Sequence, residues 1–124
     1  MERDRLMRWA LGFSAIYNFA AALLFAFPSS GPGRVAGLPP MAPLIYRMLL
    51  GFFVALFGAA YAWLWRQAEI DRPLVGFATI GKAGAFGIIL ALWLVGASPG
   101  RGVLTASGDL VLAAIFAWWL FGDR

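Results

Sequence analysis

The stretch "LVGFATIGKAGAFGIILALWLVG" (residues 74–96) decides the class of this protein. It is apolar from end to end except for one full charge, Lys82, near its middle. A helix needs about 20 mostly apolar residues to cross the hydrocarbon core of a bilayer, and this stretch has that length. The stretch therefore predicts a membrane-spanning helix, and the ammonium group at its centre requires a partner.

The composition extends this interpretation to the whole chain. Of the 124 residues, 62% are hydrophobic and only 13% are charged, whereas apolar residues are about half and charged residues about a quarter of a soluble domain. The apolar residues form blocks that predict spanning helices at about 9–27, 44–65, 73–96 and 103–121. Almost nothing is left over, so we predict an all-helical integral membrane protein in which residues 1–124 form one four-span domain. The first block is too long for the apolar region of a signal peptide, and we expect it to remain as a span.

Three connections separate the predicted spans. Residues 28–43, "PSSGPGRVAGLPPMAP", are rich in Pro and Gly and predict an outer loop that is not helical throughout. Residues 66–72 form a short charged loop on the cytoplasmic side, and residues 97–102 form a tight outer turn. Because short connections join antiparallel neighbours, the sequence predicts a compact antiparallel bundle of four transmembrane helices.

Charges outside the spans predict the orientation. Basic residues on one side are Arg3, Arg5, Arg8, Arg66, Arg72 and Arg124, and on the other side Arg34 and Arg101. Since cytoplasmic loops carry the excess of Lys and Arg, both termini are expected in the cytoplasm, and we expect the cytoplasmic membrane of a bacterium. The aromatic residues predicted for the cytoplasmic belt are Trp9, Tyr61, Trp63, Trp65, Trp118 and Trp119.

Several classes of site are excluded or disfavoured. The chain has no Cys and no His, which excludes disulfides, Cys/His zinc sites, haem ligation by His, and Cys or His catalysis. We expect no metal and no cofactor. The net charge of +4 comes from basic residues at helix ends and does not indicate nucleic acid. The glycines of "GKAGAFG" lack the preceding strand and the Lys-Ser/Thr pair of a phosphate loop, so close helix packing explains them better.

Strong polar groups lie inside the predicted spans, where a charge costs about 2.5–3.5 kcal/mol on insertion scales. They are Asn18, Arg47, Lys82 and Asp109. Helical spacing places each of them on a stripe of small or hydroxyl-bearing residues, so the polar faces are expected to converge. At about 1.5 Å per residue, Lys82 lies roughly 13 Å in from one side and Asp109 roughly 9 Å in from the other. The sequence therefore predicts a buried ion pair of Lys82 with Asp109, which Arg47 either joins or leaves by extending outward.

Three hypotheses for function follow. In the first, an intramembrane site binds or transports a small or lipid-like ligand, with candidate residues Asn18, Arg47, Thr79, Lys82, Thr105 and Asp109. If Arg47, Lys82 and Asp109 group together, their net charge of +1 favours an anionic ligand. In the second, the chain is an accessory or assembly subunit of a larger membrane complex and the ion pair is purely structural. In the third, it is a lipid- or quinone-modifying enzyme, which is disfavoured because a Lys–Asp pair is a thin catalytic set.

The partners expected from the sequence are the lipid bilayer and a second protein surface, either another copy of the chain or a different membrane protein. Small-residue faces that would allow such contact comprise Gly51, Ala55 and Gly58 on one helix and Gly81, Gly84 and Gly87 on another. Residues 12–21 also resemble residues 76–85, with Asn18 and Lys82 in equivalent positions. Chance and a parallel internal repeat both explain this similarity.

Overall fold

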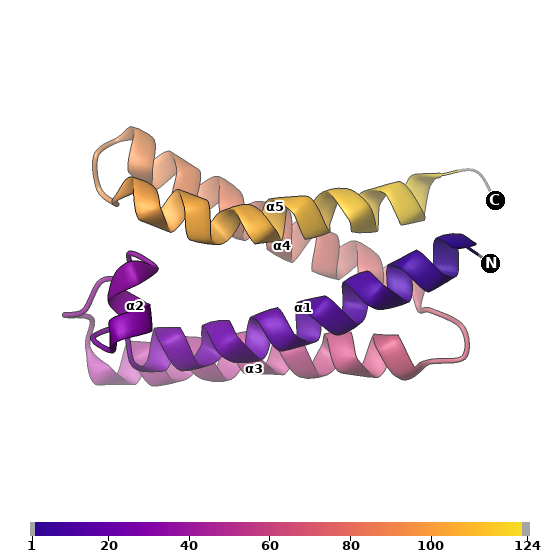
Figure 1. The fold of residues 1–124 in the computed structure, drawn as a ribbon, viewed down its shortest axis with the longest axis horizontal. Coiled ribbons are helices and arrows are strands. Elements are labelled where there is room, and N and C mark those ends of the chain that lie inside the picture. The colour runs from indigo at the N-terminus through magenta and orange to yellow at the C-terminus, as the bar shows by residue number, and fades with distance from the viewer. Residues whose placement is uncertain (1, 123–124) are drawn as a thin grey trace.

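A computed structural model describes residues 2–122, which form an all-helical protein (Figure 1). Its helices are α1 (Glu2–Ala26), α2 (Gly31–Val35), α3 (Leu44–Arg66), α4 (Arg72–Leu94) and α5 (Gly100–Phe121). All except α2 are long and apolar enough to cross a membrane, which confirms the predicted four-span class. Arg124, which contributed to the predicted orientation, lies outside the described residues.

The long helices form two antiparallel hairpins. Helix α1 packs mainly against α3, and α4 packs mainly against α5, while α1 and α5 provide the principal contact between the hairpins. Figure 1 shows the first and last helices beginning and ending at the same end of the bundle. We call this the terminal end, which also contains the α3–α4 connection. The opposite end, with α2 and the α4–α5 turn, is the loop end.

Local interactions set the limits of α4, which contains the stretch quoted above. The Asp71 carboxylate accepts a hydrogen bond from the backbone N–H of Leu74 at 3.0 Å, and Pro73 stands in the first turn. Both features are favoured at helix N-termini. The helix ends before Gly96, whose φ of +78° belongs to the left-handed region. The observed limits, Arg72–Leu94, lie close to the predicted 73–96.

Two observed elements extend the sequence prediction. Helix α1 begins at Glu2, well before the predicted start near residue 9, because the charged leader continues the helix and buries Met7 in the core. Hydropathy detects only the apolar part of such a helix. The connection 28–43 contains the short helix α2, whose first turn is capped by the Ser30 hydroxyl accepting from the N–H of Gly33 at 3.2 Å.

The core occupies the terminal half of the bundle. Its largest fully buried side chains include Met7, Leu11, Tyr61, Leu64, Val75 and Phe116, which lie towards that end of their helices. The outward faces carry many exposed large apolar side chains, such as Phe13, Ile80 and Leu104. An apolar surface of this extent suits lipid and not water, so the helices contact the bilayer.

The glycines of α3 pack inside the chain, which corrects the predicted use of Gly51 and Gly58 in a partner face; Ala55, the third residue of that face, is half-buried. A Cβ at Gly51 would lie 3.0 Å from the carbonyl oxygen of Ala22, and one at Gly58 would lie 3.2 Å from the ring of Phe19. Both glycines are buried because they allow α1 to approach α3 closely. The outcome differs on α4, where a Cβ at Gly84 or Gly87 would meet nothing within 4 Å.

Candidate functional site

An ion pair between α4 and α5 forms the centre of the site. Lys82 Nζ lies 2.8 Å from Asp109 Oδ1, which confirms the predicted pairing. The two side chains differ in burial, since that of Lys82 is 3% exposed and that of Asp109 is 20% exposed. The pair is neutral overall, which explains how a full charge is tolerated at the middle of an apolar helix.

The same ammonium group also connects the two hairpins. Asn18 Oδ1 of α1 accepts a hydrogen bond from Lys82 Nζ at 3.2 Å. The amide nitrogen of Asn18 donates in turn to the carbonyl oxygen of Val54 on α3 at 3.2 Å. All four long helices therefore contribute to one hydrogen-bonded cluster. Of the four polar side chains whose faces were expected to converge, Asn18, Lys82 and Asp109 meet here, and α3 contributes a backbone carbonyl in place of Arg47.

Two tyrosine rings enclose the ammonium group. Lys82 Nζ lies 5.3 Å from the centroid of the Tyr17 ring and 4.9 Å from that of Tyr61. These distances are typical of cation–π contacts, which stabilise a charge removed from water. The Tyr17 hydroxyl donates to the carbonyl oxygen of Thr105 at 2.5 Å and holds α1 against α5. Lys82 is thus surrounded by partners from this chain on every helix that faces it.

A cavity of about 230 Å³ borders this cluster. Its polar wall comprises Tyr17, Asn18, Lys82, Asp109 and Tyr61, and its apolar wall comprises Ala21, Phe25, Leu50, Val54, Phe57, Gly81, Ala85 and Ile89. The apolar residues Phe25, Leu50 and Ile89 lie towards the loop end of their helices. The charged pair is therefore one end of a largely apolar space that extends towards the loop end. Such a combination of apolar walls and a few convergent polar groups is typical of ligand sites.

The cavity opens between α3 and α4. Leu50, Gly81 and Ala85, which line it, are exposed to the outside of the protein. Towards the terminal end, the stacked rings of Phe57 and Phe77, with centroids 5.7 Å apart, close the space between these two helices. On the other side of the cavity, between α1 and α5, the hydrogen bond from Tyr17 to the Thr105 carbonyl closes the space. Since α3 and α4 lie at the lipid-facing surface, the opening faces the bilayer.

The remaining candidate residues lie elsewhere. The guanidinium of Arg47 donates to the carbonyl oxygen of Ala26 at the end of α1, at 3.2 Å, so of the two alternatives that the sequence left open, Arg47 extends away from Lys82 and Asp109. Val54, whose carbonyl binds Asn18, follows Arg47 by seven residues, a separation of roughly 10 Å along the helix. The cluster therefore lacks the net +1 charge that favoured an anionic ligand.

The two threonines have structural contacts. The Thr79 hydroxyl donates to the carbonyl oxygen of Val75 within α4. The Thr105 hydroxyl lies 2.9 Å from the carbonyl oxygens of both Arg101 in α5 and Ala36 after α2, and its single proton is donated to one or shared between them. Neither residue lines the cavity. A threonine hydroxyl that bonds to its own helix needs no other partner, so the structure places both residues outside the cavity that Lys82 and Asp109 border.

The tyrosines were not among the predicted site residues. Tyr61 was expected in an aromatic belt near the membrane surface, but it is only 2% exposed and lies beside Lys82. Its position on the same helical face as Gly58 and Val54 was the signal that could have placed it inside the bundle. No such pattern marked Tyr17. Its hydroxyl contacts α5, whereas Asn18, the next residue, contacts α3 and α4.

Comparison of the chain with models of protein families, with curated proteins and with solved structures gives no match.

Proposed function

We propose that this protein binds a small lipid-like ligand in the cavity bordered by Lys82 and Asp109. The single observation that carries the proposal is the position of the ion pair at the polar end of an apolar cavity inside the membrane. Ionisable groups within spanning segments commonly mark sites of function. A ligand with one polar head and an apolar body matches both parts of the lining.

The hydrogen bonding of the pair favours an uncharged head group. Lys82 already contacts Asp109 and Asn18, and two aromatic rings flank its ammonium group. An anion would have to compete with Asp109 for Lys82 in a cluster that carries no net charge. The carboxylate of Asp109 is more exposed and can accept a further hydrogen bond, since an ionised carboxylate offers about four lone-pair sites. A hydroxyl group that donates to Asp109 suits this arrangement.

The opening between α3 and α4 supports a ligand that is longer than the cavity. A head group and the first part of an apolar chain would occupy the space of about 230 Å³. The rest of the chain would pass Leu50 and Ala85 into the surrounding lipid, where it needs no protein cover. Long-chain and isoprenoid alcohols have this chemistry.

The test uses photoreactive diazirine analogues of a long-chain alcohol and of the matching carboxylic acid, added to the purified protein in lipid nanodiscs. We expect the alcohol to label residues of the cavity wall and the acid to label them less. The Lys82→Met/Asp109→Leu double variant should fold and lose this labelling, because apolar side chains replace the packing but not the hydrogen bonds. Ala85→Leu should also reduce labelling, since it narrows the opening and leaves the ion pair intact.

Arg47→Gln is the matched control, because it removes one intramembrane charge away from the cavity. It should label as the wild type does. Labelling that persists in the folded double variant would overturn the proposal. Preferential labelling by the acid would show that the site prefers a ligand with an anionic head group.

An accessory or assembly subunit of a larger membrane complex is the second candidate. Two observations favour it: Lys82 is satisfied by partners within the chain, as a purely structural ion pair requires, and α4 has an open face at Gly84 and Gly87. If the protein is such a subunit, a second membrane protein should co-purify with it in mild detergent. The Lys82→Met/Asp109→Leu variant should then also complement a deletion strain fully.

The proposed location is the cytoplasmic membrane of a bacterium, with the terminal end of the bundle in the cytoplasm. The charge distribution supports this orientation. Among the described residues, the terminal end contains Arg3, Arg5, Arg8, Arg66 and Arg72, whereas Arg34 and Arg101 lie at the loop end. With this orientation, the cavity faces the outer half of the bilayer.

A further inference from the structure

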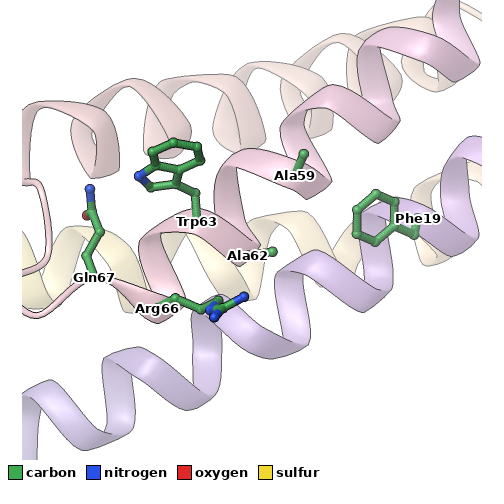
Figure 2. A pocket seen from close by; sticks show the side chains of 6 residues that line it. All are labelled: Phe19, Ala59, Ala62, Trp63, Arg66 and Gln67. Atoms are coloured by element: carbon green, nitrogen blue, oxygen red, sulfur yellow. The ribbon is translucent and has the colours of Figure 1, made fainter.

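A second hollow lies on the lipid-facing side of the α1–α3 hairpin, near the terminal end (Figure 2). It has a volume of about 610 Å³ and is lined by Phe19, Ala59, Ala62, Trp63, Arg66 and Gln67. Figure 2 shows Arg66 and Gln67 at one end of this groove and Phe19 at the other. The groove is separate from the cavity at Lys82, with which it shares no lining residue.

The apolar part of the groove follows from the small side chains of α3. Ala59 and Ala62 leave a depression between the larger side chains of Phe19 and Trp63. From Ala59 to Arg66 the helix advances about 10 Å, which is the length of a substantial part of an acyl chain. An apolar slot of this kind in a membrane is filled by lipid.

The charge at the end of the groove is available to a ligand. Other arginines at this end bind within the chain: Arg3 to the carbonyl oxygens of Trp118 and Trp119, Arg5 to Glu2, Arg8 to the carbonyl oxygens of Trp65 and Ala68, and Arg72 to the carbonyl oxygen of Leu120. Arg66 has no hydrogen bond or ion pair among residues 2–122. Within the described part of the chain, the donors of its guanidinium are unoccupied and can bind an anion at the membrane surface.

Two neighbours match the head-group region of a lipid. Gln67 accepts a hydrogen bond from the backbone N–H of Asp71 at 3.1 Å through Oε1, so its amide nitrogen remains able to donate. Trp63 is 70% exposed, and tryptophan is enriched where the hydrocarbon meets the head groups. A phosphate oxygen suits Arg66 because a guanidinium presents paired donors to it.

We propose that this groove is a binding site for an anionic phospholipid, whose phosphate binds Arg66 and whose acyl chain lies along Ala59 and Ala62. The apolar slot fits an acyl chain and the positive charge of Arg66 at its end fits a phosphate, and an anionic phospholipid has both. Basic pockets between spanning helices bind anionic lipid head groups in this way. This site does not depend on the proposed function of the Lys82 cavity.

The test is native mass spectrometry of the full chain with added phosphatidylglycerol or phosphatidylcholine. We expect the wild type to retain one phosphatidylglycerol under activation that removes phosphatidylcholine. Arg66→Gln should lower retention of phosphatidylglycerol roughly tenfold, as expected for the loss of one strong charge-assisted hydrogen bond. Arg66→Lys should restore part of it, because the charge returns without the planar fork.

Arg5→Gln is the matched control, since Arg5 lies at the same end and its removal changes the net charge equally. It should retain the lipid as the wild type does. Ala59→Phe should weaken retention without removing any charge, because it fills the apolar slot. Millimolar inorganic phosphate should not displace the lipid. Equal retention by the wild type and Arg66→Gln, an equal loss in Arg5→Gln, or displacement by phosphate alone would each overturn the proposal.

Discussion

Lys82 and Asp109 form an ion pair of 2.8 Å whose members are unequally buried, at 3% and 20% exposure of the side chain. Both side chains border the cavity, but the ammonium group is the deeper, among partners from α1, α3 and α5, and the carboxylate is the more exposed. The lysine therefore depends on the pair more than the aspartate does. Because of this difference in burial, we expect substitution of the two residues to lower the stability of the protein by different amounts.

We expect Asp109→Leu to destabilise the protein more than Lys82→Met. Removal of one member of a buried pair typically costs about 3–5 kcal/mol, and the stranded ammonium group would be the more buried charge. The double variant should be more stable than Asp109→Leu alone, because no charge is then left without a partner. Thermal unfolding in detergent measures all three variants. Strictly additive losses would show that the two groups are not coupled.

We expect the same substitution to have opposite results at two glycines. Gly51→Ala should destabilise the protein by about 1–3 kcal/mol, because its Cβ would approach the backbone carbonyl of Ala22 at 3.0 Å and push α1 from α3. Gly84→Ala should leave stability unchanged or raise it by up to about 1 kcal/mol, since the position is open and Ala favours helix. Unfolding midpoints in detergent compare the two. Equal effects would contradict the assignment of the Gly51 face to internal packing.

We expect Gly108→Val to weaken the contact between the hairpins. A Cβ at Gly108 would lie 2.9 Å from the Tyr17 ring, and the larger side chain would displace the tyrosine whose hydroxyl binds the carbonyl of Thr105. Accelerated hydrogen exchange at the middle of α1 and α5 is the expected result, with little change at the α1–α3 contacts. Tyr17→Phe removes only the hydroxyl and should cost about 0.5–1.5 kcal/mol. Unchanged exchange in Gly108→Val would show that Tyr17 does not hold the hairpins together.

We expect a reporter that is active only in the cytoplasm to work after Arg124 and to fail after Pro40. Pro40 is exposed and belongs to the connection at the loop end, opposite the end at which α5 finishes. The excess of arginine at the terminal end is the physical reason for this orientation. A reporter that is active after Pro40 and inactive after Arg124 would reverse the topology.

The sequence by itself determined the class, the spans and the central ion pair. Long apolar blocks in a chain with few charges leave only membrane-spanning helices, because backbone polar groups in lipid must be satisfied within the helix. A lone lysine and a lone aspartate at compatible depths in adjacent spans must then find each other. The helix period also brought Asn18 to the same place, since its face carries the small side chains that allow close approach.

Only the tertiary structure decided which face of each helix meets which neighbour. The rotation of α3 buries Gly51 and Gly58 against α1 and brings Tyr61 to Lys82, whereas hydropathy treats all apolar faces alike. The end of α1 supplies the carbonyl that holds Arg47 away from the cluster. The cavity itself depends on the packing of two hairpins that are tight at the terminal end and open between α3 and α4. Such a space is a property of side chains from distant segments, and no local pattern encodes it.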